Sequence, residues 1–319
     1  MAPRNRANFG IGTLVARRMA DSYLRMTQME SLHMTHGARL LLAALLTATT
    51  FGAGPDAAPA TAPSAAAQIE LQPHRAVYDL KLALSRGKRP VESVRGRILY
   101  DFTGNTCEGF ALQFRQVSEL NTGESNLFTD LRAATWEDGE AKSFRFNSQN
   151  YMNEKLVDSV DGRAERKASG VGIKLTKPSG KTVNLDTAPI FPTEHMRRII
   201  AAARAGQTVV DVSVFDGSET GEKIYDTLTV IGHPIAPDAS APADAAGKDA
   251  SLAKLTRWPV RISYFEKEKA GSGEQMPVYA IGFELYENGI SRALSLDYND
   301  FVISGEMTAL EMKKAAPCR

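Results

Sequence analysis

Cysteine is almost absent from this sequence, since the 319 residues contain only Cys107 and Cys318. Neither lies in a C-x-x-C motif, which argues against a dithiol redox centre. In an oxidising compartment the two thiols allow one disulfide, which would close a loop of about 210 residues and restrain the end of the chain. A pair of reactive thiols is the alternative.

Histidine and the motifs of common enzymes are scarce as well. Beyond the first 70 residues the histidines are His74, His195 and His233, and no two of them have the spacing of a metal site such as H-x-x-x-H. The sequence has no G-x-S-x-G, Walker A or G-x-G-x-x-G motif. Asp297 and Asp300 could flank a site, but aspartates in such a segment more often form turns. We therefore expect no enzyme activity, no metal and no cofactor.

An excess of either charge is also missing. The chain has 38 Lys and Arg against 37 Asp and Glu, a net charge of +1. Proteins that bind nucleic acid carry a strongly basic surface, which these totals do not indicate. We therefore expect no nucleic-acid partner.

The apolar run from Ala38 to Phe51 is shorter than the about 20 residues that cross a membrane as a helix. It has a positive flank of His36 and Arg39 at its start and a Pro/Ala-rich stretch behind, which is the pattern of a signal peptide. The sequence therefore predicts export. An uncleaved membrane anchor is the alternative.

The signal peptide also predicts how the chain is divided. An A-x-A pattern at residues 65–67 indicates cleavage there, residues 48–54 offer a nearer site, and Met34 is a more ordinary start. We therefore expect an N-terminal extension over 1–67, with its apolar core at 38–51 and an Ala/Pro-rich linker, and one domain over 68–319. Removing the extension leaves a slightly acidic mature chain without a transmembrane span.

Beyond the extension, apolar and polar residues alternate in short segments, which is the pattern of half-buried β-strands. Tyr78, Leu80 and Leu82 show it in the first segment, and glycine-containing turns separate many of the segments. We expect a mostly β protein whose 13–14 antiparallel strands form one strongly curved sheet, because long flat sheets expose their edges. The expected strands are residues 74–84, 93–102, 110–117, 126–137, 142–152, 156–167, 171–177, 182–185, 208–217, 223–232, 258–268, 276–287, 290–298 and 301–312.

One helix interrupts the strands. The segment PIFPTEHMRRIIAAARAGQ offers Thr193 as an N-cap and Gly206 as a stop signal. Met196, Ile199 and Ile200 fall on one face at helical spacing, so we expect this face to pack on the sheet. A short amphipathic helix on a membrane surface is the alternative.

Residues 234–248 form a stretch of low complexity, PIAPDASAPADAAGK. Such compositions lack the apolar residues that a packed segment needs. We therefore predict a flexible, solvated loop there.

Aromatic residues are frequent on the expected strands. The ordinary interpretation is a packed core, but a curved sheet of this size also encloses a cavity or groove that accepts an acyl chain or an apolar peptide. From alternation alone we expect Trp136, Trp258 and Tyr264 to point into the concave face, opposite Met196 and Ile200 of the helix.

The order of several motifs resembles the EipB family, formerly the domain of unknown function DUF1849, of α-proteobacteria. The motifs cover most of residues 70–318 and are CEGF, FPTEHMRRIIAAARAG, VFDGSE, WPVRISYF, the Asn-Gly hairpin, LDYNDFVISGEM and a late cysteine. The resemblance implies a soluble periplasmic protein with a spiral-like open β-barrel, a Cys107–Cys318 disulfide and a role in envelope integrity under stress. It implies no reaction, and its likeness to lipoprotein carriers is an analogy of fold.

We therefore interpret the protein as a non-enzymatic periplasmic protein that supports cell-envelope integrity. Its concave sheet would bind an apolar ligand or an amphipathic segment of an envelope protein. The alternatives are a carrier of lipids, acyl peptides or lipoproteins, a docking module for another envelope protein and, less favoured, a hydrolase of envelope polymers.

Overall fold

The computed structural model describes residues 69–86, 91–237, 239, 241–267, 275–315 and 317–318. The predictions for the N-terminal extension, including the signal peptide, its cleavage site and the start at Met34, lie outside the described residues.

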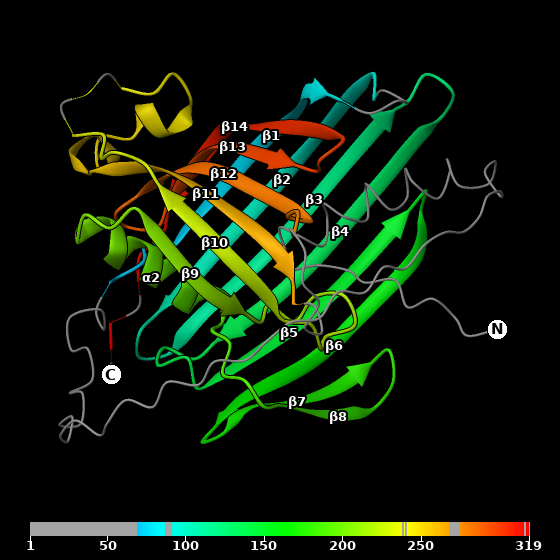
Figure 1. Cartoon of the computed structure of the whole chain (residues 1–319). Coiled ribbons are helices and arrows are strands. Elements are labelled where there is room, and N and C mark those ends of the chain that lie inside the picture. The colour runs from blue at the N-terminus through cyan, green and yellow to red at the C-terminus, as the bar shows by residue number, and fades with distance from the viewer. Residues whose placement is uncertain are drawn as a thin grey trace, which may run out of the picture.

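The fold is one antiparallel sheet of 14 strands, which confirms the predicted class. Figure 1 shows β1 to β6 as a long curved wall and β9 to β13 as a second wall facing it. The strands are β1 (His74–Ser85), β2 (Ser93–Asn105), β3 (Gly109–Asn121), β4 (Asn126–Glu137), β5 (Ser143–Met152), β6 (Lys155–Lys167), β7 (Gly170–Lys177), β8 (Lys181–Leu185), β9 (Val209–Val214), β10 (Tyr225–Ile231), β11 (Arg257–Glu266), β12 (Tyr279–Tyr286), β13 (Ser291–Asp297) and β14 (Phe301–Met312).

The two walls are joined by the pairing of the first and last strands. The strand order is β8-β7-β6-β5-β4-β3-β2-β1-β14-β13-β12-β11-β10-β9, so β1 lies beside β14 in the middle of the sheet. The ladder leaves β8 and β9 as edges, and the sheet is not closed. A single parallel bridge from Ile190 to Val214 joins the segment after β8 to the β9 edge.

Helix α2 (Pro192–Arg204) lies between the walls and packs on β9 and β10 (Figure 1). Its N-cap is Phe191 and not Thr193 as the sequence suggested, and the cap has no side-chain hydrogen bond of its own. A carboxylate from β4 supplies the missing acceptor, because Glu137 accepts the backbone N–H groups of Thr193 (2.6 Å) and Glu194 (2.8 Å). The positive φ of Gly206, 73°, lets the chain turn away just after the helix.

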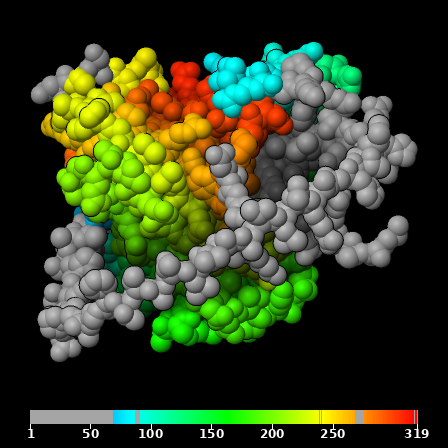
Figure 2. All heavy atoms as spheres, viewed as in Figure 1, coloured from blue at the N-terminus to red at the C-terminus, as the bar shows by residue number. Residues whose placement is uncertain are grey.

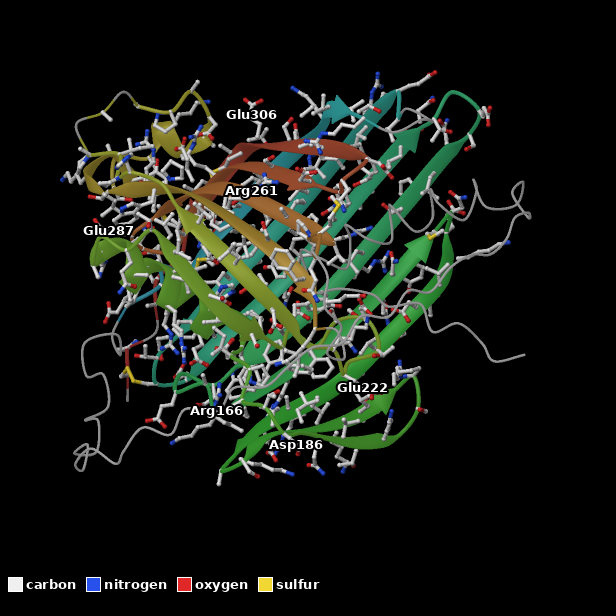
Figure 3. All side chains as sticks on the ribbon, in the orientation of Figure 1. Arg166, Asp186, Glu222, Arg261, Glu287 and Glu306 are labelled. Carbon is white, nitrogen blue, oxygen red and sulfur yellow. A yellow bond between two sulfur atoms is a disulfide. The ribbon has the colours of Figure 1, made fainter. Side chains whose placement is uncertain are left out.

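A second contact ties α2 to the first wall. Arg166, labelled in Figure 3, lies at the end of β6 and donates to Glu194 at 2.7 Å. Its guanidinium lies over the ring of Phe191 at 5.1 Å. Glu194 also accepts from Arg198 one turn later along the helix. These contacts fix the N-terminal end of α2 against β4 and β6.

The core divides into three clusters of buried side chains. One surrounds Tyr78, Tyr279 and Phe301 where β1, β12 and β14 meet. The second joins α2 to both walls through Phe102, Phe110, Ile199, Trp258 and Phe283, among others. The third, which we call the phenylalanine cluster, contains Phe144, Phe146, Phe191 and Phe215 and lies between β5–β7 and the segments that flank α2.

Part of the low-complexity stretch is not a solvated loop. Residues Ala245–Lys248 form a 3-10 helix in which Ala246 is buried in the first cluster. The preceding Asp244 is also buried and accepts from Arg292 of β13 at 2.8 Å. The prediction of a solvated loop over 234–248 is therefore wrong for residues 244–247, because small alanines fit against the sheet where composition alone suggested solvent. In the space-filling view the loop after β10 adjoins the β9–β12 surface (Figure 2).

The two cysteines are joined as a disulfide. Cys107 lies in the turn between β2 and β3, and its Cα is 5.6 Å from that of Cys318. The tail that leads to Cys318 is held at its start as well, where the Lys313 N–H donates to the carbonyl of Pro73 and Lys313 Nζ contacts Asp101. No helix within the described ranges is long and apolar enough to cross a membrane.

Candidate functional site

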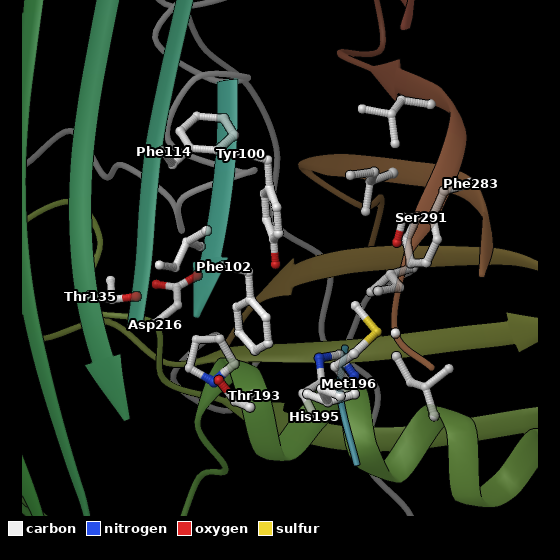
Figure 4. Close-up of a pocket in the computed structure, with 18 of the residues that line it drawn as sticks. Tyr100, Phe102, Phe114, Thr135, Thr193, His195, Met196, Asp216, Phe283 and Ser291 are labelled. Atoms are coloured by element: carbon white, nitrogen blue, oxygen red, sulfur yellow. The ribbon is translucent and has the colours of Figure 1, made fainter. Parts of the chain in front are cut away.

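The concave face forms a partly enclosed cavity of about 240 Å³ between the two walls and above α2 (Figure 4). An apolar cavity of roughly 150 Å³ is enough to hold a benzene molecule, whereas sites for drug-sized ligands have on the order of 300–1,000 Å³. The cavity therefore has room for a small apolar group or for one end of an acyl chain.

Strands β2 and β3 supply one side of the cavity. Because successive side chains of a strand point to opposite faces, Ile98, Tyr100 and Phe102 of β2 all face inward. Phe110 and Phe114 of β3 do the same, and the rings of Phe102 and Phe110 stack with centroids 5.5 Å apart. The i, i+2 spacing thus builds an aromatic wall that spans two neighbouring strands.

Helix α2 forms the floor. Thr193, His195, Met196 and Ile199 line the cavity, as does Pro192. Their spacing of three and four residues places them on one helical face. Figure 4 shows Met196 and His195 pointing from the helix toward the cavity.

The second wall completes the enclosure with apolar side chains from three strands. Ile262 and Tyr264 of β11, Ile281 and Phe283 of β12, and Leu294 of β13 all border the cavity. Figure 4 places Phe283 and Ser291 on the side opposite Thr135 and Asp216. The enclosed space is therefore bordered mainly by apolar groups, with a few polar groups at defined places.

The ionisable side chains of the lining are perturbed by burial. Burial lowers the pKa of His195 to about 4 and also lowers the pKa of His74, so both imidazoles are neutral at pH 7. His195 Nε2 lies 3.5 Å from the hydroxyl of Thr229 on β10. Burial raises the pKa of Asp216 to about 6, although its hydrogen bonds with Ser218 act in the opposite direction.

Two of the five residues that the sequence suggested for ligand binding line the cavity, namely Met196 and Tyr264. Ile200 and Trp258 do not line the cavity but are buried in the second core cluster, which also contains several of the lining residues. Trp136 does not belong to the site.

Trp136 lies on the outer face of β4. Its neighbour Thr135 lines the cavity, so alternation sends the indole to the other side. There the guanidinium of Arg145 lies over the ring at 4.9 Å, and the indole N–H donates to the carbonyl of Glu108 at 3.2 Å. The inward orientation that we expected for Trp136 is therefore wrong, because β4 carries apolar residues on both faces.

Sequence reasoning missed the buried acid of the site and most of its aromatic wall. Phe102 and Phe110 were visible as strand residues, but no local signal indicated that their rings would border a cavity and not a solid core. Asp216 lies in the FDGSE segment after β9, where an aspartate is ordinarily a turn residue. Its burial became apparent only with the tertiary structure.

The disulfide lies close to one end of this site in the sequence and in space. Cys107 belongs to the turn that connects Phe102 with Phe110, both of which line the cavity. The tail that reaches Cys318 is bound at Lys313 by Gln72, another lining residue, whose side-chain amide donates to the Lys313 carbonyl at 2.8 Å. The disulfide therefore restrains two segments that border the cavity.

Within the part of the chain that the structure describes, no three His, Cys, Asp or Glu side chains gather as metal ligands. The expectation that the protein uses no metal stays a prediction. The lining of the cavity is mainly apolar and contains one acidic side chain, Asp216.

Comparison with known proteins relates the chain to one family in sequence and in structure. The family model described as EipB-like matches residues 65–314. The cell envelope integrity protein EipB of Brucella abortus (strain 2308) is 37% identical over 254 residues, which are 79% of this chain and 88% of that protein. A crystal structure of a β-barrel-like DUF1849 protein from Brucella abortus has a TM-score of 0.71 and 35% identity, covering 77% of this chain and 100% of its own. The matched region contains every strand from β1 to β14 and helix α2.

Proposed function

Because the chain belongs to the EipB-like family, we propose that it supports the integrity of the cell envelope by binding an apolar ligand, or an amphipathic segment of a protein partner, in the cavity above α2. The role in the envelope is supported by the name of the Brucella relative. The binding step is supported by a single observation, the partly enclosed, mainly apolar space of about 240 Å³.

The proposed place of action is the periplasm. A disulfide between Cys107 and Cys318 is stable in an oxidising compartment and rare in the cytoplasm. The apolar run over 38–51 with its positive flank supports export by a signal peptide. Both observations favour a protein that works outside the cytoplasm.

The size of the cavity also bears on the second candidate, a carrier of lipids or lipoproteins. The space is smaller than the roughly 300–1,000 Å³ of ordinary small-molecule sites, so it suits one acyl chain end or one apolar side chain better than a whole lipid with two chains. A carrier of this kind would hold part of its cargo in the cavity and leave the remainder outside.

The test is native mass spectrometry of the protein purified from a bacterial periplasm, followed by organic extraction of bound molecules. Leu112→Trp fills the cavity from β3, and Leu99→Trp makes the same change on the outer face of β2, where Leu99 is 36% exposed. We expect a bound amphiphile in the wild type and in Leu99→Trp, and none in Leu112→Trp. The same adduct in Leu112→Trp would place the ligand elsewhere and overturn the proposal.

A further inference from the structure

The cavity contains one acidic side chain, Asp216, whose position is fixed by the fold. It follows β9 and is only 6% exposed. The next residue, Gly217, has a φ of 69°, and a Cβ at that position would lie 2.3 Å from the ring of Phe146. The segment is therefore held against the phenylalanine cluster, and Asp216 is directed to the cavity lining (Figure 4).

Among the residues that the structure describes, Asp216 has a hydrogen-bond partner but no cationic partner. Its carboxylate accepts the backbone N–H of Ser218 at 3.1 Å. The nearest lysine along the chain, Lys223, is instead paired with Glu219 (3.0 Å) and Glu266 (2.9 Å). Among the described residues none forms an ion pair with Asp216, which leaves a buried carboxylate without a compensating charge. Such a group costs free energy, and groups of this kind cluster at functional sites.

The rest of the lining does not supply a positive charge. It contains no Lys or Arg among the residues that the structure describes, and its two imidazoles, His74 and His195, are neutral at pH 7. Thr135 and Thr193 place hydroxyl groups on the same side of the cavity as Asp216 (Figure 4). A negative charge within low-dielectric walls attracts cations and repels anions more strongly than it would in water.

We propose that Asp216 is the anchor for a protonated amine carried on an apolar body, so that the cavity selects cationic amphiphiles and rejects those with a carboxylate head. This inference rests on the proposed function, because it names the chemical class that the same cavity binds. The ammonium group would donate to the Asp216 carboxylate, with the hydroxyls of Thr135 and Thr193 as further acceptors on the same side of the cavity. The apolar body would lie against Phe102, Met196 and Phe283.

The experiment measures displacement of the neutral fluorescent probe N-phenyl-1-naphthylamine from the protein at pH 7.5. The competitors are n-hexylammonium, n-hexanol and n-hexanoate, which share one chain and differ in the head. Forming one hydrogen bond to a charged group typically raises the affinity of a ligand about tenfold or more. We therefore expect hexylammonium to bind about tenfold or more tightly than hexanol, and hexanoate to bind more weakly than both.

The matched variants are Asp216→Asn, which keeps an oxygen to accept the Ser218 N–H, and Asp211→Asn on β9, which removes an exposed carboxylate. Asp216→Asn should bind hexanol as before and lose the preference for hexylammonium, and Asp211→Asn should keep it. Should Asp216→Asn fail to fold, the order of the three competitors on the wild type still decides the matter.

The outcomes separate the two proposals. If the wild type binds the probe and hexanol but does not prefer hexylammonium, or prefers hexanoate, the role of Asp216 is overturned while the apolar site stands. If neither the probe nor any of the three competitors binds, the proposed function itself fails.

Discussion

Two aromatic regions of this protein are built from the same residue types, yet one is solid and the other is hollow. In the phenylalanine cluster, Phe144 and Phe191 have ring centroids 5.4 Å apart, and Phe146 and Phe215 have centroids 5.6 Å apart. In the cavity wall, Phe102 and Phe110 stack at a similar 5.5 Å, but the space beside them is open. Aromatic content alone therefore does not decide whether a region is packed.

The difference comes from what approaches the rings. Backbone at Gly217 and Gly221 lies directly on the phenylalanine cluster, where a Cβ would lie 2.3 Å from Phe146 and 2.6 Å from Leu175 respectively. Over the cavity wall the opposing elements are α2 and β11–β13, whose side chains border the cavity without filling it. The phenylalanine cluster is filled because backbone packs directly on its rings. The cavity wall stays open because, among the described residues, no glycine brings backbone as close to its rings.

The largest effect that tests this comparison is expected from Phe215→Ala. Phe215 is fully buried among three other phenylalanines, so its loss should lower the free energy of unfolding by about 3–5 kcal/mol. Phe102→Ala should lower the free energy of unfolding by less, since one side of that ring already borders empty space. It should also change the binding of N-phenyl-1-naphthylamine. Chemical denaturation of both variants measures this difference, and equal losses would contradict the distinction between solid and hollow regions.

The next effect concerns the disulfide. Cys107→Ser should lower the free energy of unfolding by about 2–4 kcal/mol in non-reducing buffer, because the crosslink restrains a very long loop. Hydrogen exchange should rise in the β2–β3 turn and in the tail after Lys313, beside the cavity, and stay unchanged in the phenylalanine cluster. Under reductant the variant and the wild type should melt alike, and equal melting without reductant would show that the disulfide adds no stability.

The smallest effect is a pH dependence from His195 on the cavity floor. Its folded pKa is about 4 against an ordinary 6.5, so between these values the unfolded chain binds more protons and stability falls as the pH drops. The contribution of His195 lowers the free energy of unfolding at pH 5 by about 2 kcal/mol relative to pH 7.5.

The raised pKa values of Glu137, about 7, and Asp216, about 6, act in the opposite sense, because their stabilising contribution falls as the pH rises through this range. The comparison is therefore made between variants. Relative to the wild type, the free energy of unfolding of His195→Gln should rise by about 2 kcal/mol between pH 7.5 and pH 5. A constant difference between His195→Gln and the wild type would show that His195 titrates normally.

The class of the fold was predictable because each strand carries its own signal. Alternation identified 14 segments, and glycine-containing turns separated many of them, so strand number and antiparallel pairing followed from local patterns. Helix α2 was likewise predictable from the spacing of Met196, Ile199 and Ile200. Its cap was not, because the acceptor for its first N–H groups comes from Glu137, more than fifty residues earlier.

The site was only partly predictable, since it depends on distances between elements. Met196 and Tyr264 followed from periodicity, but on β4 both faces carry apolar residues, and the choice of face for Trp136 is decided by neighbouring strands. Asp216 lies in a turn-like sequence and is buried because glycines allow that turn to pack inward. No local sequence pattern predicts that this turn packs against the interior of the protein.

The central claim is that the cavity above α2 binds an apolar ligand, and titration of N-phenyl-1-naphthylamine into the wild type, Leu112→Trp and Leu99→Trp tests it most directly. We predict saturable binding near one probe per chain for the wild type and for Leu99→Trp, and its loss in a folded Leu112→Trp. Saturable binding that survives in Leu112→Trp, or its absence from the wild type, would contradict the claim.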